Sequence, residues 1–355
     1  MPASCLFADI PIEDMASATV ARRVAGELAM LLGFPQSRKA EAVLVTSELA
    51  HNHVMHHTVH GLIRLSGFYA SAIPCLSIAS LDQGPGFDPA VVGMRHRKNI
   101  AGCGLGAGMG TVLRLSDRLD IFSHMGRPGM QSPYETIISA LLGPDHQANE
   151  EIIRIGGSLA ILSQSRGGEG WGGGDGVHVQ QDGRYSRITI VDSLGLGQGA
   201  AEITSRVFTE LDRHSLFWPP ANLLEEVEFA LAETNGAAVH VLLFDRVKGL
   251  LSSAGIGNIA TLISLDGELI EETDPAGILG HAKWRKITGQ EYKVLSGVRV
   301  AMHTDGQKRI ADLSADFSLS PAVIAQMLFE PLTPQRDDAT LVTWQWPEKS
   351  TNHYT

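Results

Sequence analysis

The sequence predicts an α+β protein with two domains, and three features lead to this prediction. The chain has 355 residues, enough for two domains that each bury their own core. In residues 1–142, amphipathic helices come first and strands suited to an antiparallel sheet follow. From residue 152 onward, strands outnumber helices and short turns join many of them, which favours two packed sheets flanked by helices.

The first domain begins with two predicted helices. Over residues 9–32, apolar side chains recur mostly three or four positions apart, and Gly33 and Pro35 then end the helix. The same criteria predict a second helix over 37–57. The remaining elements are two strands, a helix and two further strands, at 61–69, 74–82, 105–117, 119–123 and 133–141.

A polar, turn-rich stretch at 143–151 is the predicted linker. It places the first domain at 1–142 and the second at 152–348, with 349–355 as a tail. The predicted helices of the second domain are 198–213, 219–233 and 321–329. Its predicted strands are 152–162, 176–181, 186–192, 238–245, 249–255, 259–264 and 297–303.

Composition narrows the class of protein. Hydrophobic residues make up 44% and charged residues 19% of the chain, as in soluble globular proteins. The formal net charge of -11 argues against nucleic acid as the main partner. No apolar run reaches the ~18 residues that span a bilayer, and residues 1–30 lack the basic start of a signal peptide. Cys5, Cys75 and Cys103 show no pairing or metal-ligand spacing. We therefore expect a cytoplasmic protein with no membrane partner.

Glu48 and Asn52 stand four positions apart on the second predicted helix, so they share one face. Together they would position a hydroxyl or water and coordinate Mg²⁺, which takes few protein ligands besides substrate phosphates. Taken alone, such a pair is more often a solvated helix face.

Two glycine-containing segments follow. Asp82 ends an apolar strand, where its carboxylate would accept a hydrogen bond from an adenine amine, and Gly84 and Gly86 allow close backbone approach. An ordinary strand-ending turn has the same pattern. Farther on, a loop before the 105–117 helix offers backbone amides for phosphate. Its residues are Gly104, Leu105, Gly106 and Gly108.

The segments 47–52, 82–86 and 104–117, in this order, resemble the GHKL (Bergerat) ATP-binding family. The resemblance is strongest to the RsbT- and RsbW-like serine kinases and covers residues 10–142. It implies that Glu48 is the general base, Asn52 the Mg²⁺ ligand and Asp82 the adenine contact. The glycines 84, 86, 104, 106 and 108, with Leu105, would shape the ATP pocket.

A histidine cluster lies between these segments. His53, His56, His57 and His60 are expected along one helical face, with His51 nearby. Zinc binding and a solvated, pH-sensitive surface are both open readings, and the solvated surface is favoured because no cysteine or acidic residue has matching spacing.

Acidic residues recur at strand ends or turns in the second domain. Asp175, Asp192, Asp305 and the pair Asp337–Asp338 each resemble ordinary turn carboxylates when considered singly. Jointly they would line a site between two sheets. Their hard oxygen atoms select Mg²⁺ or Mn²⁺, and two such ions orient a nucleophile toward phosphorus.

The segments 174–176, 191–195, 254–258, 303–306 and 336–340 resemble the PPM metal-dependent phosphatases of the SpoIIE and RsbX branch, over residues 152–346. The resemblance implies that Asp192 bridges two ions, that Asp175 binds one of them, and that Asp305 and Asp337 bind the other. The backbone carbonyl of Ser193 would also bind metal. Relatives usually carry glycine at Ser193 and histidine at Leu196, and these differences would lower metal affinity or turnover.

The resemblances imply a Bergerat-fold α/β sandwich followed by a PPM-type α-β-β-α sandwich. The main hypothesis is a bifunctional partner-switching enzyme, with an ATP-dependent serine/threonine kinase domain and a Mg²⁺- or Mn²⁺-dependent phosphatase domain. Its expected partners are STAS-domain or anti-sigma-type regulators of a bacterial stress pathway. One alternative is a phosphatase regulated by a non-catalytic GHKL module. The other is a non-catalytic scaffold.

Overall fold

The structure is a computed structural model. The residues that it describes are 6–87, 106–126, 132–145, 159–165, 173–281, 286–295, 297–310, 317–332 and 337–346. No helix in this described part of the chain is long and apolar enough to cross a membrane.

The N-terminal half contains one antiparallel sheet in the order β1-β2-β3-β5-β4. Its strands are β1 (Leu6–Pro11), β2 (Leu62–Ala70), β3 (Ile73–Asp82), β4 (Arg118–Ser123) and β5 (Thr136–Leu142). Ser71 and Ala72 make the β2–β3 turn with positive φ angles of 49° and 69°. This turn holds β2 and β3 in register along their whole length.

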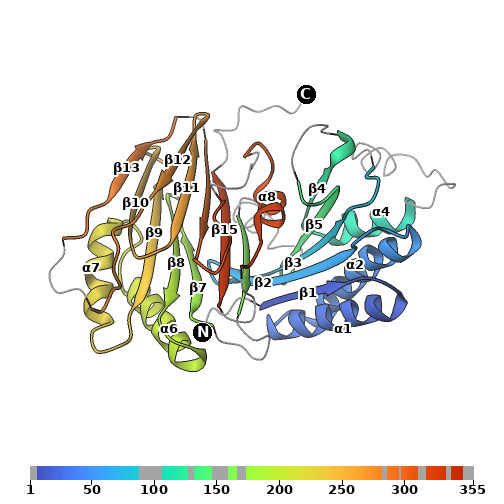
Figure 1. The fold of residues 1–355 in the computed structure, drawn as a ribbon, viewed down its shortest axis with the longest axis horizontal. Coiled ribbons are helices and arrows are strands. Elements are labelled where there is room, and N and C mark those ends of the chain that lie inside the picture. The colour runs from blue at the N-terminus through green and yellow to red at the C-terminus, as the bar shows by residue number, and fades with distance from the viewer. Residues whose placement is uncertain are drawn as a thin grey trace.

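Helices α1 (Met15–Leu31), α2 (Gln36–Met55) and α4 (Gly106–Leu115) cover one face of this sheet (Figure 1). Their buried side chains form one core with the sheet. The predicted helix at 9–32 was wrong at its start. The Asp14 carboxylate caps α1 by accepting a bond from the Ser17 amide at 2.8 Å, and the preceding residues pair with β2 as strand β1.

The C-terminal half contains two antiparallel sheets, in the orders β13-β10-β9-β8-β7 and β12-β11-β14-β15-β6. The first consists of β7 (Asp175–Gln181), β8 (Tyr185–Ser193), β9 (Ala237–Asp245), β10 (Leu250–Ile256) and β13 (Gln290–Lys293). The second consists of β6 (Leu159–Gln164), β11 (Ala260–Leu265), β12 (Glu268–Glu272), β14 (Val298–His303) and β15 (Ala339–Trp346). Apolar side chains from both sheets fill the space between them.

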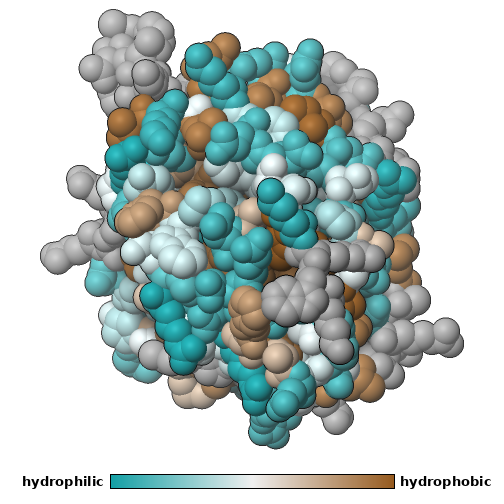
Figure 2. All heavy atoms as spheres, turned by 90° about the vertical axis from the view of Figure 1, so that its left-hand side faces the viewer, coloured by the Kyte–Doolittle hydropathy of each residue, from teal (hydrophilic) through white to brown (hydrophobic). Residues whose placement is uncertain are grey.

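Helices cover the outer faces of this pair of sheets. Helices α6 (Gly197–Arg213) and α7 (Pro220–Ala230) pack on the first sheet, and α8 (Pro321–Leu328) packs on the second. Figure 2 shows that apolar side chains are scattered among polar ones on the side of the molecule to the left in Figure 1. The predicted mixed α+β class is confirmed, but strands β12 and β13 were missed.

The two halves share buried surface. Helix α8 lies between its own sheet and strands β4 and β5 of the N-terminal sheet (Figure 1), where Leu328 shares a core with Phe122 and Ile137. Phe68 and Cys75 of the N-terminal sheet also belong to the same core as Leu159 of β6. The predicted boundary at 143–151 stays a prediction, because residues 146–158 lie outside the described part of the chain.

Candidate functional site

The C-terminal candidate site begins at one end of the β7–β8 ladder. Asp175 opens β7 and pairs directly with Asp192 near the end of β8. The pKa of Asp192 is raised to about 7, first by burial and then by the carboxylates of Asp305 and Asp337. Burial and then Asp192 raise the pKa of Asp175 well above its usual value. Carboxylates crowded in this way attract cations.

The second sheet supplies the other wall of this site. Asp305 follows β14, and Asp337 and Asp338 precede β15, which pairs with β14. Asp338 accepts a bond from the Gly174 amide at 2.6 Å. Segments far apart in the sequence therefore meet where the two sheets come together.

Two polar side chains hold these carboxylates, a role that the sequence did not predict for either of them. The Thr304 hydroxyl donates to Asp175 at 2.7 Å and accepts from the Thr340 amide at 3.0 Å. The Asn258 amide donates to Asp305 at 2.5 Å. Asn258 lies within the segment 254–258 and Thr304 within 303–306. A search for short polar donors beside strand-end aspartates would have found Thr304.

Ser193 adopts a backbone conformation that suits serine. Its φ angle is not positive, whereas those of Gly195 and Gly197 are 124° and 58°. The Ser193 amide donates to the Gly174 carbonyl at 3.1 Å, and its hydroxyl lies 2.8 Å from that of Thr204 on α6. The positive φ angles therefore fall on two glycines, which adopt them without strain. The side chain of Leu196, between these glycines, is 66% exposed and so makes little contact with the rest of the protein.

A tighter group of ligand-type side chains lies elsewhere. Glu210, His214 and Glu226, on α6 and α7, each place one ligand atom within 4.8 Å of the others. Glu210 is already bonded to Arg213 at 2.7 Å and to His214 at 3.0 Å. These contacts place Glu210 in a network of side chains at the C-terminal end of α6, so the group is accounted for without a metal ion.

The N-terminal candidate site contains two sets of contacts. Glu48 and Asn52 both face the start of α4. The Asn52 amide lies 3.8 Å from the Met109 sulfur, and a Cβ atom on Gly108 would stand 2.5 Å from the Glu48 carboxylate. Gly106 is the first residue of α4. Gly104 and Leu105 lie outside the described residues.

Asp82 forms the second set at the end of β3. Its buried carboxylate accepts a bond from the Gly84 amide at 2.8 Å, and it pairs across the ladder with Thr136. Its pKa is raised, chiefly by burial. Gly86 has a φ angle of 72°, in the region that favours glycine. His56 interacts electrostatically with Asp82, so the end of α2 lies near the end of β3.

The histidines do not share one helical face, because α2 ends at Met55 and the chain then turns. His57 and His60 have positive φ angles of 47° and 52°. His53 is 3% exposed, with Nδ1 2.7 Å from Thr58 and Nε2 2.9 Å from Ser80. Burial lowers the pKa of His53 to about 4. The expectation of a single histidine face was therefore wrong.

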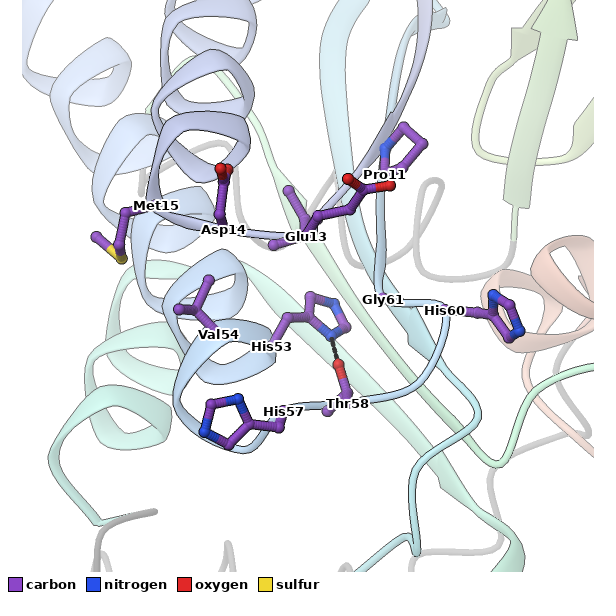
Figure 3. A pocket seen from close by; sticks show the side chains of 11 residues that line it. Pro11, Glu13, Asp14, Met15, His53, Val54, His57, Thr58, His60 and Gly61 are labelled. Atoms are coloured by element: carbon purple, nitrogen blue, oxygen red, sulfur yellow. Dashed lines mark hydrogen bonds between the residues drawn. The ribbon is translucent and has the colours of Figure 1, made fainter.

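A cavity of about 480 Å³ lies beside these histidines. Figure 3 shows His53 turned toward Thr58, His57 below it, His60 to the right, and the start of α1 above them. The α1 side is lined by Glu13, Asp14 and Met15.

Neither a protein-family profile nor a curated protein matches the chain. Solved structures do match, and they include PP2C-type phosphatases. RsbX in complex with magnesium is 19% identical over 53% of this chain and 94% of its own, with a TM-score of 0.48. The SpoIIE phosphatase domain from Bacillus subtilis is 15% identical over 56% and 95%, with a TM-score of 0.42.

A structure described in work on the bacterial stressosome is 22% identical over 52% of this chain and 97% of its own, with a TM-score of 0.46. Each of these three matches covers about half of the chain. With TM-scores below 0.5, the similarities by themselves assign no function.

Proposed function

We propose that the C-terminal half is a metal-dependent phosphatase of the PPM type that acts on phosphoserine or phosphothreonine in proteins. The observation that supports this most is the meeting of Asp175 and Asp192 with Asp305 from the opposite sheet. Buried carboxylates this close to one another are stabilised either by a shared proton or by a bound cation, and a divalent cation would compensate several of them at once.

The residues present fit Mg²⁺ or Mn²⁺. Their donor atoms are carboxylate oxygens, the hard ligands that these ions prefer, and we propose that Asp175, Asp192, Asp305 and Asp337 hold the ions together with the Ser193 carbonyl. Bound divalent cations would activate water and neutralise the charge on the phosphate ester.

The chain's own contribution is to fix the ligands before substrate arrives. Thr304 holds one oxygen of Asp175, and Asn258 holds one oxygen of Asp305. The Gly174 amide orients Asp338 beside them. Partners of this kind set the direction of a ligand's free lone pairs and thereby tune metal affinity.

Hydrolysis of p-nitrophenyl phosphate with Mn²⁺ tests this proposal. We expect Asp192→Asn to reduce hydrolysis to background. Asp212→Asn, on the exposed side of α6, is the matched control and should retain activity. Mn²⁺-dependent hydrolysis that survives Asp192→Asn would contradict the assignment. In that case this pocket would have no catalytic role, as in the alternative of a non-catalytic scaffold.

We also propose that the N-terminal half is a GHKL-type domain that binds Mg-ATP and phosphorylates a serine or threonine of a partner protein. The supporting observation is that Glu48 and Asn52 lie against the start of α4. A helix start offers amides for phosphate. In this proposal Glu48 is the general base, Asn52 binds Mg²⁺ and Asp82 contacts adenine.

The proposed partners are STAS-domain or anti-sigma-type regulators in the bacterial cytoplasm. Incubating the protein with labelled ATP and such a partner, followed by a Mn²⁺ chase, tests both halves. Glu48→Ala should abolish labelling, but it should still remove label in the presence of Mn²⁺ from a partner that the wild-type protein has already phosphorylated. If ATP changes phosphatase activity equally in wild type and Glu48→Ala, the N-terminal half is a regulatory binding module instead.

A further inference from the structure

Gln307 is a buried polar residue that the proposed chemistry does not use. It is 1% exposed and directly follows the turn that carries Thr304 and Asp305. Its side-chain amide donates to the Leu328 carbonyl at 2.7 Å, and its side-chain oxygen accepts from the Glu330 amide at 2.9 Å. Gln307 therefore ties this turn to the C-terminal end of α8.

The same helix is tied to the N-terminal sheet. The Gln326 side-chain oxygen accepts a bond from Arg64 of β2 at 3.3 Å, and both residues are almost fully buried. Arg64 also pairs with both oxygens of Asp9 at 2.8 Å. Its guanidinium lies 5.7 Å from the ring of Phe7 and 5.1 Å from the ring of Phe329, so β1, β2 and α8 meet at one cation.

The other end of this series of contacts reaches the candidate metal ligands. The Gln307 backbone amide donates to the Thr304 carbonyl at 3.2 Å. The Thr304 hydroxyl in turn holds Asp175. Hydrogen bonds and one short helix therefore connect Arg64 in the N-terminal half to Asp175 in the C-terminal half.

We infer that Gln307 is a positioning residue for the Thr304–Asp305 turn, and that the N-terminal half sets the metal affinity of the C-terminal site through α8. This inference rests on the phosphatase proposed above. A buried amide loses free energy if its bonds are left unmade. A shift of α8 on the N-terminal sheet therefore moves the turn with it, rather than breaking the two bonds.

The first test is Gln307→Met in the full chain, which keeps the side-chain length and removes its two bonds to the end of α8 together with a local bond to the Lys308 carbonyl at 3.0 Å. We expect the Mn²⁺ concentration for half-maximal hydrolysis to rise ~10-fold, since outer partners of metal ligands commonly have effects of this size. The rate at saturating Mn²⁺ should stay within ~3-fold of wild type, because the metal ligands themselves are unchanged.

The second test changes only the contact between the halves. Gln326→Leu removes the acceptor for Arg64 and leaves Gln307 and every proposed ligand in place. We expect a smaller rise of the Mn²⁺ requirement in the same direction. The matched control is Gln180→Leu, which removes the acceptor for Arg187 and the donor to Asp212 near the opposite end of β7 from Asp175. That variant should keep the wild-type Mn²⁺ requirement.

The outcomes separate the inference from the proposed function. If Gln307→Met and Gln326→Leu lower the melting temperature but keep the wild-type Mn²⁺ half-saturation, Gln307 has only a structural role and the inference is overturned. If wild type hydrolyses nothing at any Mn²⁺ concentration, the phosphatase proposal fails. Calorimetric Mn²⁺ affinities of the same variants then decide the coupling, and equal affinities would overturn it.

Discussion

His240 and Asp274 form a buried ion pair, with Nδ1 of the imidazole 2.7 Å from the carboxylate. Nε2 lies 3.0 Å from the Ser253 hydroxyl and 3.4 Å from Glu272. Burial lowers the pKa of His240, but the two acidic partners outweigh it and raise the pKa to about 9. The carboxylate of Asp274 packs against Gly255, close to the turn that carries Asn258.

This pair predicts a loss of stability in alkali. The folded pKa of about 9 exceeds the unfolded value of ~6.5, so the contribution is complete below the unfolded pKa. It disappears as pH rises through 9, and its size is on the order of 3 kcal/mol. Urea unfolding at pH 6, 8 and 10 measures it. His240→Gln should lack this part of the pH dependence, and an unchanged slope would contradict the prediction.

His53 predicts a loss of stability in acid. Its folded pKa is about 4, below the unfolded value of ~6.5, so the unfolded chain takes up a proton first as the pH falls. Stability should drop between these two values by up to ~3 kcal/mol. Urea midpoints at pH 7.5, 5.5 and 4.5 check this. His53→Gln should flatten the trend, and a variant as acid-sensitive as wild type would rule out His53 as its source.

Two glycines of α4 offer a matched pair for the N-terminal site. Alanine at Gly108 would place its Cβ atom 2.5 Å from the Glu48 carboxylate, whereas Gly110 has open space around it. We expect Gly108→Ala to displace Glu48 and to lower phosphoryl transfer at least ~10-fold. Gly110→Ala should transfer normally and gain slightly in helix stability. Equal transfer by both variants would remove Glu48 from the proposed chemistry.

Thr304 offers a test of ligand positioning in the C-terminal site. Thr304→Val removes the hydroxyl that donates to Asp175 and accepts from Thr340. We expect Mn²⁺-dependent hydrolysis to fall ~10- to 100-fold. Thr304→Ser keeps the hydroxyl and should retain most activity. A Thr304→Val enzyme with wild-type activity would show that Asp175 needs no such partner.

Glycine at position 174 is required for the close approach of two strands. A Cβ atom there would lie 2.5 Å from the Ser193 carbonyl oxygen, while Gly183 has nothing nearby. We expect Gly174→Ala to weaken Mn²⁺ binding, measured by calorimetry, because it moves the Ser193 carbonyl. Gly183→Ala should bind Mn²⁺ as wild type does. Normal binding by Gly174→Ala would exclude that carbonyl as a ligand.

Local patterns predicted much of the secondary structure, and contacts between distant segments account for what they missed. Strand β1 is short, and its only strand partner among the described residues is β2, more than 50 residues away in the sequence. The local sequence pattern therefore did not predict it. The prediction of a helix over 37–57 was nearly correct, because α2 spans Gln36–Met55. The histidines after Met55 looked helical by spacing alone, but the chain turns there so that His53 can bond Thr58 and Ser80.

The aspartates of the C-terminal site stood out because each adjoins an apolar strand. That Asp175 faces Asp192 depends on the register of the β7–β8 hairpin, which the sequence does not state. The bonds that Thr304 and Asn258 make to aspartates were not predicted, because asparagine and hydroxyl side chains are common near turns for local reasons. Their importance comes from where Asp175 and Asp305 stand in space.

Helix α8 contributes to the cores of both halves, because it packs between the sheet that contains β15 and the N-terminal sheet. A fragment cut between the halves would leave Ile324 and Leu328 facing water on one piece and Phe122 and Ile137 on the other. When produced separately, the two pieces would self-associate or bind each other through these exposed apolar surfaces. Co-expressing the two pieces should therefore reconstitute a complex. Fusing either half to another domain would require that domain to cover the apolar surface that now packs against the other half.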